Sequence, residues 1–392
     1  MIKILDSKKS NYLSNLKLIL EKRRTRSKIN TDIVVKIVKD IKKNKQKALI
    51  KYEKKFSKNT KIKPTKNEIT KSIKSLDPKI KNAIDFAYSR ILKFHSLQKN
   101  KNIKYVDKQN NKIEYKYIPI QSVGIYVPSN LPSTLLMNAI LAKKIAGVKR
   151  VVLANPRLNG KLNPAVMYAA KKCGISEIVS AGGSQAIASL AYIQKVNKIV
   201  GPGNDYVARA KKEVFGDVGI DMVAGPSEVS IVADKFADPD FVAADLIAQA
   251  EHDVNAQSIL ITNNKKLIPL VNLSLKKQLL KLPKKNIATK SLKNFGLAIF
   301  ANSKKKILDA INIIAPEHLE LFTNTNKEII KGVKNAGSIF VGKYSPEAIG
   351  DYIAGPNHVL PTSGSARFSS GLSVNDFLKR HSLIKITKTG IE

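Results

Sequence analysis

Apolar stretches with strand character alternate with helix-like stretches throughout residues 121 to 200. The strand-like segments are SVGIYVP, VKRVVLA, SEIVSAGG and VNKIVGPG, and the helical segments between them are TLLMNAILAKKIAG, PAVMYAAKKCG and SQAIASLAYI. Alternation at such short intervals predicts a parallel sheet with helices on its faces. Because ligands of such sheets usually bind in loops at the carboxyl ends of the strands, we expect binding residues there.

A second series of the same kind follows from residue 228 onward. Its strand-like segments are EVSIVAD, AQSILIT, FGLAIFA and AGSIFVG, with helices expected from Asp238-Pro239 and over about residues 303 to 314. Aspartate is a good helix N-cap, and proline fits the first helical position. Residues 1 to 120 show apolar spacings suited to helices with one buried face. We therefore predict an α/β protein with two alternating units and a helical N-terminal scaffold.

The chain is strongly basic, with a formal net charge of +39 over 392 residues. The excess is mostly lysine scattered among asparagine and isoleucine, and not arginine interleaved with aromatic side chains that stack on bases. Residues 201 to 260 are instead acidic. These patterns indicate a solvated lysine-rich surface and no specific nucleic-acid partner.

Cysteine content and hydropathy bear on where the protein works. Cys173 is the single cysteine, so the chain alone cannot form a disulfide framework or a thiolate metal cluster. No run of about 18 uncharged apolar residues is present, and the N-terminus lacks the apolar core of a secretory signal. We therefore expect a cytoplasmic protein without a membrane partner.

The segment DLIAQAEHD, residues 245 to 253, gathers polar groups around one of only five histidines. Asp245, Gln249 and His252 are spaced i, i+4 and i+7, which places them on one helix face. The stripe has two explanations: a solvated face that ends in a histidine, or two ligands of a metal site. A further ligand must then come from elsewhere, and GDYIAGPNH offers Asp351 and His358.

The segment IIAPEHLEL sets Glu317 beside His318 directly after Pro316. Neighbours on a regular helix point about 100° apart, so both could face one substrate only at an irregular junction, which the proline favours. A histidine exchanges protons near neutral pH, and a carboxylate beside it can activate water. The pair therefore suits proton chemistry, although adjacent Glu and His also occur by chance.

Two glycine turns, SAGGSQ at 180 to 185 and VGPGND at 200 to 205, follow strand-like segments. Their N–H groups could approach an anion, or they could be ordinary strand-to-helix turns. Neither matches a dinucleotide fingerprint. A third turn, AGPSEVS, leaves Ser227 and Glu228 at the mouth of a strand.

Taken together and in this order, VGPGNDYVARAKKEVFGDVGIDMVAGPSEVSIVAD, ADLIAQAEHD, APEHLEL and GDYIAGPNHVLPTSGSARFSSGLSV resemble histidinol dehydrogenase, from about residue 20 onward. The resemblance implies a zinc-dependent homodimer that oxidises L-histidinol through an aldehyde to L-histidine with two NAD. It also implies two incomplete Rossmann-like domains of the aldehyde dehydrogenase superfamily. The domain bounds expected from it are an arm over 1–19, domain 1 over 20–121 with 228–371, an NAD-binding domain 2 over 122–227, and a tail over 372–392.

The same resemblance assigns roles to individual residues. It implies one Zn²⁺ per subunit held by Gln249, His252 and Asp351, and it returns His358 to a structural role. His318 would accept the hydroxyl proton as a hydride leaves, and Glu317 would activate the water that adds to the aldehyde. The expected NAD contacts are Tyr126, Gln185 and Asn204, and the expected substrate contacts are Ser227, Gln249, His252, His318 and Asp351.

The sequence departs from the family pattern in three segments. SNLPST after YVP is short and lacks two glycines, and LAYIQKVNK is also short. The sequence ends at ITKTGIE, where the family continues into a helical tail that supplies a Glu and a zinc-binding His to the partner subunit. Two alternatives therefore stay open: a related dehydrogenase with another small alcohol as substrate, or a catalytically impaired relic.

Overall fold

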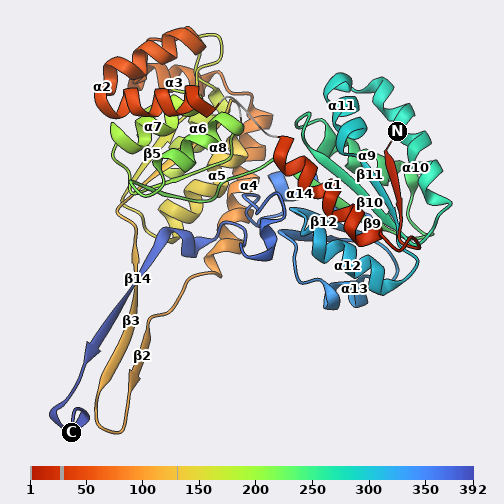
Figure 1. Ribbon diagram of the computed structural model, residues 1–392. Helices are drawn as coiled ribbons and strands as arrows, with labels where there is room; N and C mark the ends of the chain where they lie inside the picture. Colours follow the sequence, from red (N-terminus) through yellow and green to blue (C-terminus); the bar gives the residue numbers. More distant parts are fainter. Residues whose placement is uncertain (1, 27–30, 130) are drawn as a thin grey trace. The chain divides into compact units, whose positions relative to one another are not determined.

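The computed structural model describes residues 2–26, 31–129 and 131–392 (Figure 1). Within it the chain forms two compact units, which we call the first and the second unit. The first comprises Met1–Ile29, Ala224–Asp351 and Leu360–Gly371, and the second comprises Asn30–Val223, Tyr352–Val359 and Leu372–Glu392.

The first unit is built on a six-stranded parallel sheet with the order β1-β11-β10-β9-β12-β13. The five strands from β9 to β13 lie in the order 3-2-1-4-5 when β9 is counted as strand one. This is the order of a dinucleotide-binding sheet without its sixth strand. The remaining strand, β1, pairs with β11 at the edge. The bounds are β1 Lys3–Asp6, β9 Glu228–Ala233, β10 Gln257–Thr262, β11 Leu297–Phe300, β12 His318–Phe322 and β13 Ser338–Val341.

Helices cover both faces of this sheet (Figure 1). On one face, Ile231 of β9 packs with Leu246 of α9 and with side chains of α10 and α11. On the other face, Val232 packs with Leu16 of α1 and with α12. Successive strand residues therefore serve two separate cores. The helices are α1 Tyr12–Arg26, α9 Pro239–Ala250, α10 Leu267–Lys281, α11 Lys285–Phe295, α12 Lys304–Ile314, α13 Asn326–Gly332 and α14 Glu347–Tyr352.

The start of α9 confirms the prediction made from its capping residues. The Asp238 side chain accepts the Asp240 N–H at 2.8 Å, and Pro239 occupies the first turn, where no backbone N–H is needed.

The second unit contains a five-stranded parallel sheet with the order β6-β5-β4-β7-β8. Counted from β4, this is again 3-2-1-4-5, so the two sheets share one strand order. One face packs on α4, α5, α6 and the π-helix η1, and the other packs on α2, α7 and α8. The bounds are α2 Thr31–Ser57, α3 Lys66–Lys74, α4 Pro78–Ser96, β4 Ser122–Tyr126, α5 Pro132–Ala139, η1 Ile140–Ile145, β5 Arg150–Ala154, α6 Pro164–Cys173, β6 Glu177–Val179, α7 Gly183–Tyr192, β7 Lys198–Val200, α8 Asp205–Val214 and β8 Gly219–Ile220.

Residues 30–121 belong to the second unit, whereas we expected residues 20–121 to join residues 228–371. Ile37 and Ile41 of α2 share a core with Ile187 of α7. Ile91 of α4 shares the opposite core with Leu136 of α5. The apolar spacing correctly indicated a buried face on these helices, but spacing does not specify which sheet that face covers.

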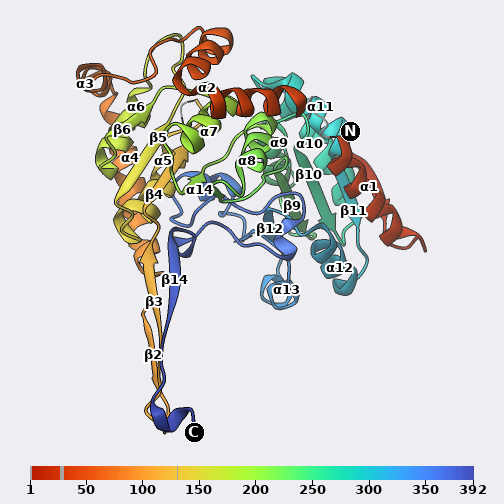
Figure 2. The same ribbon diagram turned by 60° about the vertical axis from the view of Figure 1, so that its left-hand side comes forward.

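A three-stranded antiparallel sheet, which we call the β-arm, projects from the rest of the second unit (Figure 2). It consists of β2 Ile103–Val106, β3 Lys112–Pro119 and β14 Leu378–Lys385, and the short 3-10 helices η2 Ser365–Arg367, η3 Val374–Phe377 and η4 Lys388–Gly390 complete the chain. Residues 372–392, expected as a separate tail, thus supply a strand of this sheet. The expectation that residues 1–120 are helical is wrong for β1, β2 and β3, whose β-branched and aromatic residues favour strands.

Candidate active site

A cavity of about 650 Å³ lies at the carboxyl edge of the five-stranded sheet. It is lined by residues that follow four strands: Tyr126 at the end of β4, Pro156 after β5, Gly182 after β6 and Asn204 after β7. The strand order reverses between β4 and β7, and such switch points are where α/β sheets bind ligands. Tyr126, Gln185 and Asn204, the three expected NAD contacts, all line this cavity.

Tyr126 and Asn204 also have hydrogen bonds within the protein. The Tyr126 hydroxyl accepts the Gly183 N–H at 3.1 Å, and burial raises the pKa of this hydroxyl. Asn204 is the N-cap of α8, where its Oδ1 accepts the Val207 N–H at 3.2 Å. Any ligand contact by Asn204 is therefore additional to a capping role.

Gln185 is held by a buried carboxylate that the sequence did not single out. Its Nε2 donates to Glu53 Oε1 at 2.7 Å, and Glu53 also accepts the Gly182 N–H at 2.9 Å. Burial raises the pKa of the Glu53 carboxyl group, while these hydrogen bonds lower it. Because the N–H groups of Gly182 and Gly183 both have partners inside the protein, the structure favours the ordinary-turn explanation for SAGGSQ.

The VGPGND turn uses glycine for close backbone approach. A Cβ on Gly201 would collide with the Tyr126 carbonyl oxygen, and Gly201 has a φ of +117°. A Cβ on Gly203 would collide with Val207. Gly201 therefore lets the turn after β7 pack against the end of β4, and Gly203 lets it approach the first turn of α8.

In the first unit, Glu317 and His318 lie at a junction between a helix and a strand. Ala315 ends α12 with a left-handed backbone (φ 50°, ψ 60°), Pro316 follows, and β12 begins at His318. A non-glycine residue in this region is uncommon and is often found near functional sites. The expected irregular junction is therefore present, and it leads into a strand. Glu317 and His318 are only 6% and 5% exposed.

A second carboxylate faces His318. His318 Nδ1 lies 3.5 Å from Oε2 of Glu347, the first residue of α14. The backbone N–H of Glu347 donates to Glu320 Oε1 at 2.7 Å, which fixes the start of α14 over β12. A carboxylate beside one ring nitrogen favours proton acceptance by the other. The sequence analysis missed Glu347, for which the only signal was a helix start after Ser345-Pro346.

The polar stripe of α9 faces the side of β12 that carries His318 and Glu320. Asp245 forms a side-chain hydrogen bond with Glu320. Gln249 lies about 6 Å further along α9 and His318 about 7 Å back along β12. Because α9 connects two strands parallel to β12, it runs against them, so both offsets point toward the amino ends of the strands. With ideal helix and strand geometry, these offsets place Gln249 and His318 at the same level of the two elements.

Gln249 is fully buried, and neither its Oε1 nor its Nε2 has a hydrogen-bond partner in the described part of the chain. Burying an amide without partners is costly, so such a group points to a ligand. It lies on the last turn of α9, where the helix carries a partial negative charge that suits a cation.

Asp245 and Glu320 form a buried carboxyl pair behind this stripe. Burial and the neighbouring Asp245 raise the pKa of Glu320 to about 9, and burial raises the pKa of Asp245. Glu320 is fully buried. The pair therefore keeps a proton at neutral pH, which lets one carboxyl group donate to the other.

The expected zinc ligands are only partly described. His252 is exposed beyond the end of α9, and its N–H donates to the Gln249 carbonyl at 3.3 Å. Asp351 is placed on α14, and its side chain lies outside the described residues. Within residues 2–26, 31–129 and 131–392, no three His, Cys, Asp or Glu side chains cluster as a metal site. Gln249 is an amide and not one of these residue types, and the Asp351 side chain lies outside the described residues, so Gln249 carries the fit to a metal.

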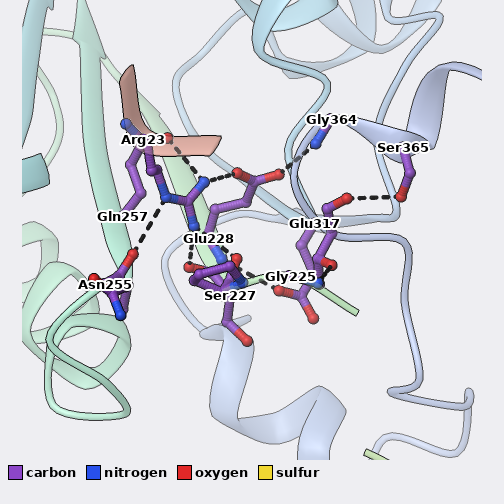
Figure 3. Close-up of polar contacts among 12 residues, drawn as sticks. Arg23, Gly225, Ser227, Glu228, Asn255, Gln257, Glu317, Gly364 and Ser365 are labelled. Atoms are coloured by element: carbon purple, nitrogen blue, oxygen red, sulfur yellow. Dashed lines mark hydrogen bonds and ion pairs between the residues drawn. The ribbon is translucent and has the colours of Figure 1, made fainter. Parts of the chain in front are cut away.

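Ser227 and Glu317 are brought together through one peptide (Figure 3). Ser227 precedes β9, and its carbonyl accepts Arg23 Nη2 at 2.9 Å and the Gln257 N–H at 3.0 Å. The N–H of the following residue, Glu228, donates to Glu317 Oε2 at 3.2 Å. The sequence analysis placed Glu228 at the strand mouth but gave no role to Arg23.

In the first unit the expected site residues lie at the opposite edge from the one that parallel sheets usually use. Ser227 precedes β9, His252 precedes β10, and Glu317 precedes β12, so these residues lie at the amino ends of the strands. His358, the other metal candidate, lies in the second unit, where its Nε2 is 3.4 Å from Thr134 Oγ1.

The family model for histidinol dehydrogenase matches residues 20–392. The chain belongs to the histidinol dehydrogenase family. It is 57% identical to the histidinol dehydrogenase of Pelagibacter ubique over 100% of this chain and 93% of that protein. It is 47% identical to that of Rhizobium meliloti over 82% of this chain and 76% of that protein. Membership makes the protein an oxidoreductase.

Solved structures support the same assignment. Histidinol dehydrogenase from Elizabethkingia anophelis matches 100% of this chain and 92% of its own, with a TM-score of 0.91 and 37% identity. An acetylating aldehyde dehydrogenase from Geobacillus thermoglucosidasius matches with a TM-score of 0.51 and 13% identity over 96% of this chain and 97% of its own. The second match shows a shared α/β fold alone.

None of the helices within the described residues is both long enough and apolar enough to span a membrane.

Proposed function

We propose that this histidinol dehydrogenase family member oxidises L-histidinol to L-histidine through the aldehyde, using two NAD, in histidine biosynthesis. The observation that carries the proposal is the buried pair Glu317 and His318, with Glu347 Oε2 3.5 Å from His318 Nδ1. The high identity to curated histidinol dehydrogenases supports this substrate, and the comparisons do not favour another alcohol or an impaired relic.

The two residues of the pair divide the proton chemistry. His318 accepts the hydroxyl proton while a hydride leaves the carbinol carbon, and the negative charge of Glu347 stabilises the imidazolium that results. Glu317 then accepts a proton from the water that adds to the aldehyde, and a second hydride leaves the hydrate. Two hydrides and three protons therefore leave and one water molecule enters, which balances an alcohol against a carboxylate.

NAD supplies the hydride acceptor in both steps, and Tyr126, Gln185 and Asn204 would contact it. Their common cavity lies at the switch point of the five-stranded sheet, which supports this assignment. Both parallel sheets contain the strand order 3-2-1-4-5. We assign the five-stranded sheet to NAD binding, as an incomplete Rossmann-like domain.

Zinc, one ion per subunit, would be held by Gln249, His252 and Asp351 and would orient the amine and imidazole of histidinol. The partnerless amide of Gln249 supports a ligand at this position. Ser227 would contact the substrate from the loop before β9. The proposed proton transfers do not depend on the geometry of the metal, because His318 and Glu317 move the protons.

A homodimer is the assembly that we propose. The β-arm exposes a series of apolar side chains, and exposed apolar patches commonly mark protein interfaces. They include Ile103, Tyr105, Val106, Leu383 and Ile384. Sedimentation velocity of the intact protein tests this: a single species at twice the chain mass, 86.4 kDa from 2 × 43.2 kDa, is expected. We also propose a cytoplasmic location, which the single, buried Cys173 suits.

The function is tested by stoichiometry. With limiting L-histidinol, excess NAD and added zinc, we expect two NADH and one histidine per histidinol. A control alcohol that keeps the imidazole but lacks the amine should turn over poorly. Binding of zinc and NAD without NADH formation would support the impaired relic, and turnover of other alcohols alone would support a different substrate.

A further inference from the structure

One buried arginine organises the amino end of the sheet in the first unit (Figure 3). Arg23 lies on α1 and is 4% exposed. A guanidinium group has five N–H donors, and here five oxygen atoms accept from it. The acceptors are the Asn255 carbonyl from Nε at 3.2 Å, Glu228 Oε2 and Gln257 Oε1 from Nη1, the latter at 3.2 Å, and the Pro226 and Ser227 carbonyls from Nη2 at 2.6 and 2.9 Å.

The partner carboxylate is held as firmly as the arginine. Glu228 is 1% exposed; its Oε2 pairs with Arg23, and its Oε1 accepts the Gly364 N–H at 3.1 Å. A buried ion pair with all its acceptors filled fixes local geometry, even where it adds little net stability. The segment from Pro226 to Glu228 is therefore held by hydrogen bonds from Arg23, Gly364 and Gln257.

A short chain of hydrogen bonds leads from this pair to Glu317. Arg23 Nη2 donates to the Ser227 carbonyl at 2.9 Å, and the N–H of the same peptide, on Glu228, donates to Glu317 Oε2 at 3.2 Å. A carbonyl that accepts from a cation polarises its peptide, which strengthens the donor on the other side. The peptide thus transmits the charge of Arg23 to the carboxylate of Glu317.

We propose that Arg23 and Glu228 are positioning residues for the second oxidation, and that the Ser227–Glu228 peptide holds the Glu317 carboxylate in place to activate water. This inference rests on the proposed function, because it depends on the role given to Glu317. Arg23 is not proposed to contact the substrate, because it binds the carbonyl of the Ser227–Glu228 peptide and Glu317 binds the N–H on the other side of that peptide. Lysine cannot replace Arg23 fully, since an ammonium group has three donors and no planar fork.

The inference predicts a selective defect. Arg23→Gln should slow oxidation of added histidinaldehyde about 10- to 100-fold, as expected for one hydrogen bond to a charged group, but slow oxidation of histidinol to the aldehyde by about threefold or less. During turnover of histidinol the variant should release aldehyde that a carbonyl trap captures, and the NADH yield should fall from two toward one.

Matched variants separate positioning from loss of fold. Lys17→Gln removes a charge from an exposed position on the same helix and should leave both steps unchanged. Arg23→Lys should recover part of the aldehyde step. Glu228→Gln, which keeps its backbone N–H, should show the same selective defect in weaker form. In a Glu317→Gln background, Arg23→Gln should cause almost no further loss of aldehyde oxidation.

Equal losses in both steps, or independent losses in the double variant, would overturn the inference and leave Arg23 a structural residue. If Arg23→Gln does not fold, the selective loss of aldehyde oxidation is tested with Arg23→Lys and Glu228→Gln instead. A wild-type protein that forms no NADH from histidinol would contradict the proposed function. In that case hydrogen exchange at the Glu228 amide still tests the hydrogen-bond chain, because the chain requires faster exchange at this amide in Arg23→Lys than in the wild type.

Discussion

The two parallel sheets of this protein share the strand order 3-2-1-4-5 but place their candidate site residues at opposite ends. In the second unit, Tyr126, Gln185 and Asn204 follow the carboxyl ends of strands. In the first unit, Ser227, Glu317 and His318 lie at the amino ends. One strand order therefore carries candidate site residues at different edges in the two units.

The opposite ends differ in their electrostatics, and the difference matches the proposed ligands. The carboxyl edge of the second unit meets helix N-termini, such as that of α8 at Asn204, which favour anionic groups such as the phosphates of a dinucleotide. The amino edge of the first unit meets the C-terminal end of α9 at Gln249, which favours cations. A cationic substrate and a zinc ion suit that end.

The strongest test of the amino edge is His318→Asn. We expect turnover of histidinol to fall by about 10²- to 10⁴-fold, the range for a general base, because asparagine cannot accept the hydroxyl proton. Zinc content and NAD affinity, measured by metal analysis and by titration, should stay unchanged. Activity that survives this change would show that another group is the base.

A smaller effect is expected from Gln249→Leu, which should weaken zinc binding at least 10- to 100-fold. The same change should leave the metal-free protein equally or more stable, because it removes a buried amide that has no protein partner. Gln257→Leu is the matched control. It should lose stability, since Gln257 Oε1 accepts from Arg23 at 3.2 Å. Thermal unfolding with and without zinc separates the two, and a destabilised metal-free Gln249→Leu would contradict the ligand role.

The carboxyl edge is tested by Asn204→Ala and Asn204→Ser. Alanine should raise the KM for NAD about fivefold and cost about 1 kcal/mol of stability, because the N-cap of α8 is lost. Serine restores the cap, so it should recover stability but not NAD affinity. The KM for histidinol should not change in either variant. Equal recovery of both properties by serine would reduce Asn204 to a capping residue.

The smallest effect concerns the buried pair Asp245 and Glu320. Because folding raises the pKa of Glu320 to about 9, its protonated form stabilises the fold at low pH, and this contribution is lost as pH rises toward that value. Glu320→Gln keeps a donor toward Asp245 and an acceptor for the Glu347 N–H. Urea unfolding between pH 5 and 9 should therefore show a weaker pH dependence in the variant than in the wild type. Parallel curves would contradict a raised pKa for Glu320.

The alternating segments could be predicted from the sequence because apolar runs and turn residues are local signals. Asp238-Pro239 marked the start of α9 correctly, and the predicted strand from SVGIYVP is β4. The β-arm was missed for two reasons. The local pairing of β2 with β3 could have been predicted from their β-branched and aromatic residues, which were interpreted as helical. The pairing of β3 with β14 joins strands more than 250 residues apart, which leaves no local trace.

The site was predictable only in part. Spacing predicted Gln249 and His252 on one helix face, but α9 ends at Ala250 and His252 lies beyond it. The packing of α9 against β12 cannot be deduced from spacing. Glu347 and Arg23 reach the site from separate elements, α14 and α1, and the local sequence does not show that either element lies there. Lysine dominates the basic residues of this chain, so the arginines of EKRRTR stand out, but nothing in the sequence separates Arg23 from Arg24 and Arg26.

The most direct test of the account is zinc-edge anomalous diffraction from crystals grown with zinc and NAD. We predict one zinc peak at the amino edge of the six-stranded sheet, in contact with Gln249, His252 and Asp351, and NAD density against Tyr126, Gln185 and Asn204. A zinc peak that touches none of the three proposed ligands, or NAD bound away from the cavity at the carboxyl edge of the five-stranded sheet, would contradict it.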